Sequence, residues 1–144
     1  MTNTELIDAL ESHYGERFRR TSDTRAMVEI DTGERRSQVV YVLTHEVNRE
    51  DRDFSRLVVE TSIGPVPRRG ADYESLLRRN ADLPVGAIGI ADLRIDDGTV
   101  VAYYVLRATH QLSTLSFEDA WDLIEHVARD ADRLERDIFG SDLH

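Results

Sequence analysis

Three segments of the chain carry apolar residues at consecutive positions, and this feature most restricts how the chain can fold. They are residues 39–43, 57–59 and 100–106, with the sequences VVYVL, LVV and VVAYYVL. A β-strand with one face in water alternates apolar and polar residues, because successive side chains point to opposite faces of a sheet. The consecutive pattern therefore predicts strands that need cover on both faces.

The surrounding pattern predicts one α+β domain over residues 1–144, with a five-stranded antiparallel sheet. The expected element order is α-β-β-β-α-β-β-α. Helices are expected over residues 4–18, 72–80 and 117–138, and strands over residues 26–31, 37–47, 56–63, 87–95 and 99–108. Residues 48–54 are almost wholly charged, so they are expected to form a solvated connection between two strands. Two long helices can cover one face of such a sheet, so the other face needs the short helix, a second subunit or a ligand.

Local signals support the boundaries of the first and last helices. Thr2 with Glu5 and Ser116 with Asp119 have the spacing of N-terminal capping boxes. Gly140 follows the last apolar position of the final helix, where a glycine commonly ends a helix. Residues 32–34 and residues 96–98 each contain a glycine between two expected strands, which predicts hairpin turns.

The charge composition is unusual and indicates a habitat. All 18 basic residues are arginine, the chain holds 28 acidic residues, and the net charge is −10. A GC-rich genome would favour arginine over lysine, yet it would not explain the excess of acids. Carboxylates keep a protein soluble in concentrated salt better than ammonium groups do, and molar salt screens their mutual repulsion. The composition therefore predicts a protein of a salt-accumulating halophile, most simply a halophilic archaeon.

Composition also excludes several classes of function. A charge of −10 disfavours nucleic acid and anionic membrane as partners. The absence of cysteine excludes disulfides, zinc–thiolate sites and thiol nucleophiles. No apolar run has the length of a membrane-spanning helix, and the first residues lack the pattern of a signal peptide. We therefore expect a cytoplasmic protein.

Three motifs along this element order resemble the YbjN-like family. They are LVVETSIGP at residues 57–65, LLRRN at residues 76–80 and LPVGA at residues 83–87, and the likeness continues through residues 96–98 to the last helix. This family is grouped with the type III secretion chaperones and the Tir-chaperone-like fold. The resemblance implies a twisted antiparallel sheet flanked by helices. It also implies a small acidic homodimer that holds an extended segment of a client protein, and it brings no catalytic residue or cofactor.

The leading hypothesis is therefore a non-enzymatic, homodimeric, chaperone-like module that binds a protein or peptide client. The apolar residues of the short helix, Tyr73, Leu76 and Leu77, are predicted to form the dimer interface. The second face of the sheet is predicted to hold the client segment. Its predicted lining is Val40, Val42 and Val58.

Two alternative functions use other residues. Arg68 and Arg69 precede the short helix, so a small-ligand regulatory domain with an anion site near them is one alternative. His45 and His110 each stand at or after the end of a strand, so a metal-dependent enzyme that uses this pair is the other. The histidine pair has no third partner at a recognisable spacing, and the arginines also fit a turn with solvated side chains, so no catalytic residue, metal site or cofactor is predicted.

Overall fold

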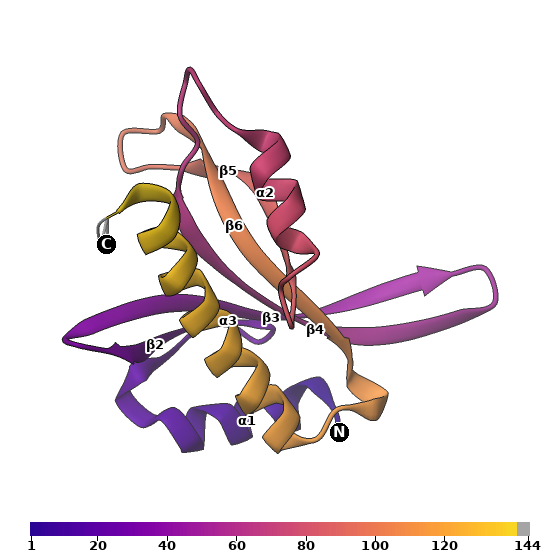
Figure 1. Cartoon of the computed structure of the whole chain (residues 1–144). Helices are drawn as coiled ribbons and strands as arrows, with labels where there is room; N and C mark the ends of the chain where they lie inside the picture. The colour runs from indigo at the N-terminus through magenta and orange to yellow at the C-terminus, as the bar shows by residue number, and fades with distance from the viewer. Residues whose placement is uncertain (141–144) are drawn as a thin grey trace.

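A computed structural model describes residues 1–140 as an antiparallel sheet with three helices on one of its faces (Figure 1). The six strands lie in the order β1-β2-β3-β4-β6-β5, and every neighbouring pair is antiparallel. The elements are α1 (Asn3–Tyr14), β1 (Phe18–Ser22), β2 (Arg25–Gly33), β3 (Arg36–Arg49), β4 (Arg52–Pro65), α2 (Tyr73–Asn80), β5 (Ala87–Arg94), β6 (Val100–Gln111) and α3 (Phe117–Phe139).

The prediction of five strands was wrong, because residues 1–140 form six in the order α-β-β-β-β-α-β-β-α. The missed strand is β1, which the sequence analysis assigned partly to the first helix. That helix ends at Tyr14, since Gly15 has a φ of 61° that a helix cannot continue. The chain then runs along β2, with Phe18 opposite Val28. This pairing makes the polar segment 19–22 an edge strand.

The capping predictions for the two long helices are confirmed. The side chain of Thr2 accepts from the backbone N–H of Glu5, and the Glu5 carboxylate accepts from the N–H of Thr2. Ser116 and Asp119 form the same reciprocal pair at the start of α3. Gly140 ends α3 in the left-handed conformation, as its position predicted.

Most of residues 48–54, which were expected to form a charged connection between two strands, belong to the strands themselves. β3 continues to Arg49 and β4 begins at Arg52, so only residues 50–51 form the turn. The paired segments 45–49 and 52–56 form a two-stranded ribbon that projects beyond the rest of the sheet (Figure 1). We call these two segments and their turn, residues 45–56, the ribbon.

All three helices pack on the same face of the sheet. α3 lies across β2, β3, β4 and β6, α1 packs beside β1 and against α3, and α2 lies beside β5 (Figure 1). Burial in one shared core places them there, since helix and strand residues belong to a single buried cluster. Its members include Leu6, Ile7, Leu10, Leu76, Ile124 and Val127 from the helices and Val40, Val42, Leu57, Val59 and Leu106 from the strands. The short helix therefore does not cover the second face.

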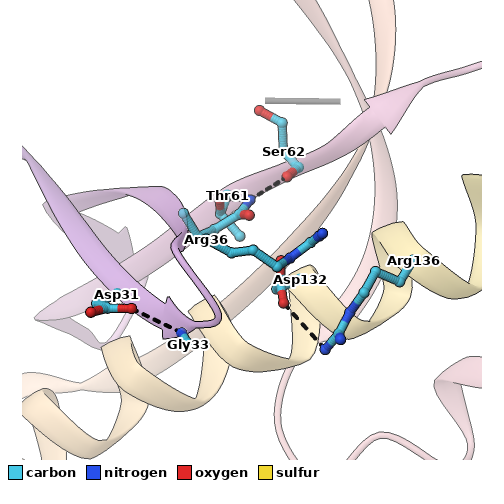
Figure 2. A network of polar contacts seen from close by, with 8 residues as sticks. Asp31, Gly33, Arg36, Thr61, Ser62, Asp132 and Arg136 are labelled. Atoms are coloured by element: carbon cyan, nitrogen blue, oxygen red, sulfur yellow. Dashed lines mark hydrogen bonds and ion pairs between the residues drawn. The ribbon is translucent and has the colours of Figure 1, made fainter. Parts of the chain in front are cut away.

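A polar contact under α3 ties this helix to the hairpin of β2 and β3 (Figure 2). Arg36 donates from Nε to Oδ1 of Asp132 over 2.9 Å, and Arg136 lies 3.3 Å from the other carboxylate oxygen. Asp132 is 2% exposed, so this carboxylate depends on the two arginines for its partners. The turn that places Arg36 there holds Glu34 and Arg35 at positive φ, a conformation that costs about 1–2 kcal/mol per residue.

Polar side chains also join β3 to β4 inside the core. Gln38 donates to the Thr61 hydroxyl over 2.8 Å and to the Ser62 carbonyl over 2.7 Å, and Thr61 donates in turn to the Val39 carbonyl. Gln38 and Thr61 are both buried, and each has partners for its hydrogen bonds. These bonds fix the register of the two strands under α3.

At the other end of α3, an aromatic contact joins it to α1. Tyr14 donates to Glu125 over 3.3 Å, and burial together with the charge of Glu125 raises the pKa of Tyr14. The ring centroid of His13 lies 4.4 Å from that of Trp121.

No helix among residues 1–140 is long and apolar enough to cross a membrane.

Candidate functional site

The second face of the sheet carries apolar side chains, and none of the helices of residues 1–140 covers it. In an antiparallel sheet, residues opposite each other on neighbouring strands have their side chains on the same face. Met27, Tyr41 and Glu60 are linked in this way from β2 through β3 to β4, and the pairing of Glu60 with Arg107 continues to β6. We call this surface the open face, and its exposed or partly buried apolar residues are Met27, Val39, Tyr41, Leu43, Leu93, Val101 and Tyr103.

The open face is hollowed. A groove of about 350 Å³ is bordered by Met27 and Tyr41 on one side and by Leu93 of β5 on the other. Three strands, β3, β4 and β6, lie between β2 and β5 in the sheet, so side chains of β2 and β5 reach one groove only because the sheet curls. Curling makes the open face concave, and a concave apolar surface is the usual form of a binding site.

The carboxylate of Glu60 lines this groove. Its side chain is largely buried and forms an ion pair with the more exposed Arg107 on the neighbouring strand, which lies outside the lining. Arg25 lies at the rim, at the start of β2. The groove therefore combines apolar walls with a carboxylate whose charge Arg107 compensates, which suits a ligand that is mostly apolar and carries some polar groups.

Two of the three residues predicted to line the client site lie on the helix-covered face of the sheet instead. Val40 and Val42 are 0% and 1% exposed, because they point into the core under α3. Val58 points to the open face but is itself buried, at 3% exposure. The residues that a ligand could touch are the neighbours of these valines, Tyr41 and Leu43. Strand alternation identified the two sets of side chains, yet both sets are apolar, so the sequence could not show which one the helices cover.

The predicted dimer residues lie on a second apolar surface, between α2 and β5. Tyr73 and Leu77 are 50% and 67% exposed, and Ile90 of β5 beside them is 52% exposed. Leu76 instead points into the core, so it supports the fold and is not available to a partner. Tyr104 lies beneath this surface. Its burial raises its pKa, and the charges of Tyr73 and Asp72 raise it further. We call Tyr73, Leu77 and Ile90 the α2–β5 patch.

The patch borders a free sheet edge. β5 pairs with β6 and with no other strand among residues 1–140. The N–H of Ile88 points away from β6, since it donates to Oδ1 of Asn80 over 2.6 Å. Backbone groups alternate in direction along a strand, so the N–H and C=O groups of Ile90 and Asp92 also point outward. An unpaired edge beside exposed apolar side chains is a surface that readily takes another strand.

The residues of the two alternative functions do not form sites. Arg68 and Arg69 are exposed, and the N-terminus of α2 behind them is already capped by the Asp72 carboxylate, which accepts from the N–H of Ser75. An anion there would meet this negative charge. No observation among the described residues therefore favours an anion site at the two arginines.

His45 and His110 lie on opposite faces of the sheet. Thr44, Leu57 and His110 are opposite one another on β3, β4 and β6, so their side chains point to the helix-covered face. His45 follows Thr44, so its side chain points to the open face. The two rings cannot meet around one metal or substrate. Among residues 1–140, moreover, no three metal-binding side chains come together.

The sequence analysis missed a group of residues on the ribbon. Arg49, Arg52 and Arg56 point to one side of it, together with Phe54. Their spacing in β4, at positions 52, 54 and 56, is the period of two that a strand face requires. That signal was present in the sequence, but it was overlooked because the segment was expected to be an irregular connection.

No protein-family model matches the chain, and no curated protein matches it.

Proposed function

We propose that this chain is a non-enzymatic, homodimeric module that holds a segment of a client protein on the open face of its sheet. The observation that carries the proposal is the concave apolar groove, which no element of residues 1–140 covers. A soluble protein seldom leaves such a surface exposed unless something binds there. The resemblance to the YbjN-like and secretion-chaperone families is part of the same proposal.

A polypeptide segment suits the groove better than a compact reactive substrate. The walls are apolar, and the carboxylate of Glu60 is compensated by Arg107 outside the lining. Among residues 1–140, no hydrogen bond to a base activates the aliphatic hydroxyls of the lining, those of Thr21 and Ser62. Extended segments bind sheets through main-chain hydrogen bonds at an edge and through pockets for alternate side chains. The open face offers the pockets, and the strands at its borders offer the edges.

The α2–β5 patch supports homodimerisation. A two-fold axis beside β5 would place Leu77 and Ile90 against their own copies and would bring the two free edges together. One surface then serves both subunits, which is why two-fold dimers are the commonest oligomers. The open face is not consumed by this contact, so both grooves would stay available to clients.

Replacing Leu77 by aspartate is expected to convert the dimer to a monomer. The substitution would place a carboxylate against its own copy in an apolar contact, where an unpaired charge is costly. Light scattering in 2 M KCl measures the mass. Val39→Asp is the matched control, since Val39 is similarly exposed on β3, away from the patch, and this variant should remain a dimer. A wild-type mass of one chain at micromolar concentration would refute dimerisation.

A photo-crosslinker in the groove is expected to label a client. Benzoylphenylalanine in place of Tyr41 would project from the open face. The control carries the same amino acid in place of Trp121, where it would project from α3 on the other side of the molecule. Irradiation in lysate at molar KCl should produce covalent adducts at position 41 and none at position 121. Equal labelling at both positions, or labelling at neither, would contradict a client site on the open face.

We also infer that the protein works in the cytoplasm of a salt-accumulating archaeon. The supporting observations are the absence of lysine and the net charge of −10. An apolar groove binds more strongly in molar salt, because salts excluded from protein surfaces favour burial. The inferred habitat and the inferred mode of binding are therefore physically compatible.

A further inference from the structure

The ribbon is a pair of strand segments that projects from the sheet (Figure 1). Its two segments pair with each other from His45 opposite Arg56 to Arg49 opposite Arg52. Beyond the base of the ribbon, its outer edges pair with no other strand of residues 1–140: the ladder of β2 ends opposite Leu43, and the ladder of β6 ends opposite Arg56. Figure 1 shows the ribbon standing clear of the sheet and of every helix.

The two faces of the ribbon differ in charge. Cross-strand partners share a face, so the pairing divides its side chains into two sets. One set holds only basic, imidazole and apolar groups: His45, Val47, Arg49, Arg52, Phe54 and Arg56. The opposite set is polar and acidic: Glu46, Asn48, Asp53 and Ser55. We call the first set the basic face, and it continues the open face, since Leu43 and Val58 precede its first pair.

The basic face is electrostatically unfavourable by itself. Arg49 and Arg52 stand directly opposite each other, and like charges in that position destabilise a sheet. Their guanidinium groups lie 5.9 and 5.4 Å from the ring centroid of Phe54, so both arginines gather at one aromatic ring. Neither has an ion pair with a carboxylate of residues 1–140, although the chain is rich in acids. A partner that brings carboxylates would relieve this repulsion.

We propose that the basic face of the ribbon binds an extended acidic segment of the client protein. This inference rests on the proposed function, because the segment belongs to the client that lies on the adjoining open face. A strand laid along the ribbon presents alternate side chains to it. The complementary pattern is an acidic residue at each end of a five-residue stretch with an apolar residue in the middle. The acids would meet Arg56 at one end and the pair Arg49 and Arg52 at the other, and the apolar residue would meet Phe54 and Val47.

Three features favour a polypeptide over a nucleic acid. The turn between the arginines of the ribbon is Glu50-Asp51, so carboxylates lie next to the basic face and would repel a continuous row of phosphates. The net charge of −10 repels any polyanion at long range. The free backbone edges offer hydrogen bonds in strand register, which a polypeptide can match and a nucleic acid cannot.

Fluorescence anisotropy with a designed probe tests the proposal in 1 M KCl, where long-range attraction is screened. The probe is a fluorescein-labelled threonine peptide with valine at its centre and glutamate two positions to each side. We expect saturable binding that weakens about tenfold in the double variant with Arg49→Gln and Arg52→Gln, since it removes two ion pairs. The matched control is the double variant Arg68→Gln with Arg69→Gln. It makes the same change of charge at two exposed arginines in a loop outside the ribbon. The control should bind as tightly as the wild type.

Several outcomes would overturn the inference. The first is an equal loss of peptide affinity in both double variants. The second is a peptide with glutamine in place of glutamate that binds as tightly as the original probe. The third is a labelled oligothymidine of twelve nucleotides that binds more tightly than the peptide. A change in light-scattering mass in the ribbon variant would assign the basic face to contact between copies and would also overturn it. If the peptide does not bind while position 41 still cross-links a client, the inference fails and the proposed function stands.

Discussion

Replacing Arg36 by methionine is expected to lower the free energy of unfolding by about 3–5 kcal/mol. Arg36 forms a hydrogen-bonded ion pair with Asp132, and the two side chains are 16% and 3% exposed (Figure 2). Methionine replaces the unbranched aliphatic part of the arginine side chain but carries no charge, so the variant leaves the Asp132 carboxylate buried with one cation fewer. An incompletely paired buried charge costs far more than a surface ion pair contributes.

Urea unfolding at constant KCl concentration measures this loss, and Arg35→Met provides the control. Arg35 is exposed and has a φ of 61°, so an unbranched replacement leaves the strain of its backbone unchanged. The control should change stability by less than about 0.5 kcal/mol. A loss below about 1 kcal/mol in Arg36→Met would show that the contact under α3 is not a buried ion pair of the expected strength.

The thermal midpoint is expected to rise steeply as KCl increases from about 0.1 M to 2 M. The chain carries 28 acidic and 18 basic residues, so repulsion among carboxylates opposes the compact state at low salt. The screening length falls from about 10 Å at 0.1 M to about 3 Å at 1 M, which removes most of this repulsion. Salt also strengthens the burial of the apolar core at the higher concentrations.

Scanning calorimetry at several KCl concentrations measures the midpoint. Sucrose is the control, because it favours burial by exclusion but screens no charge. A rise with KCl that sucrose does not reproduce would identify charge screening as the cause. A midpoint that stays flat or falls between 0.1 and 2 M KCl would contradict the inference of a halophilic protein.

Much of the fold could be predicted because its signals are local. The capping boxes of α1 and α3 depend on residues three positions apart, and their apolar stripes depend on residues three or four positions apart. The consecutive valines of β3 and β4 likewise indicate strands without any tertiary information. In these segments local preference and the final structure agree.

The strand β1 and the ribbon lacked such signals. Residues 18–22 have the sequence FRRTS, with a single apolar residue, and they become a strand because β2 offers them an edge. The ribbon is charged at most positions, yet the ladder between β3 and β4 continues through it to Arg49 and Arg52. Pairing with a neighbouring strand decided both segments, and pairing is not visible within a short window of sequence.

The candidate site shows the same division. The period of two along β3 determines, from the sequence alone, that Val40 and Val42 share one face and that Val39, Tyr41 and Leu43 share the other. Only the tertiary structure decided that the helices cover the first set, because both sets are apolar and either could have formed the core. It also placed Leu93 of β5 beside the groove that Tyr41 borders, since the curl of a sheet arises from the twist of all its strands together. The composition determined the charge of this protein, whereas the packing of α1, α2 and α3 on one face determined which surface is free to bind.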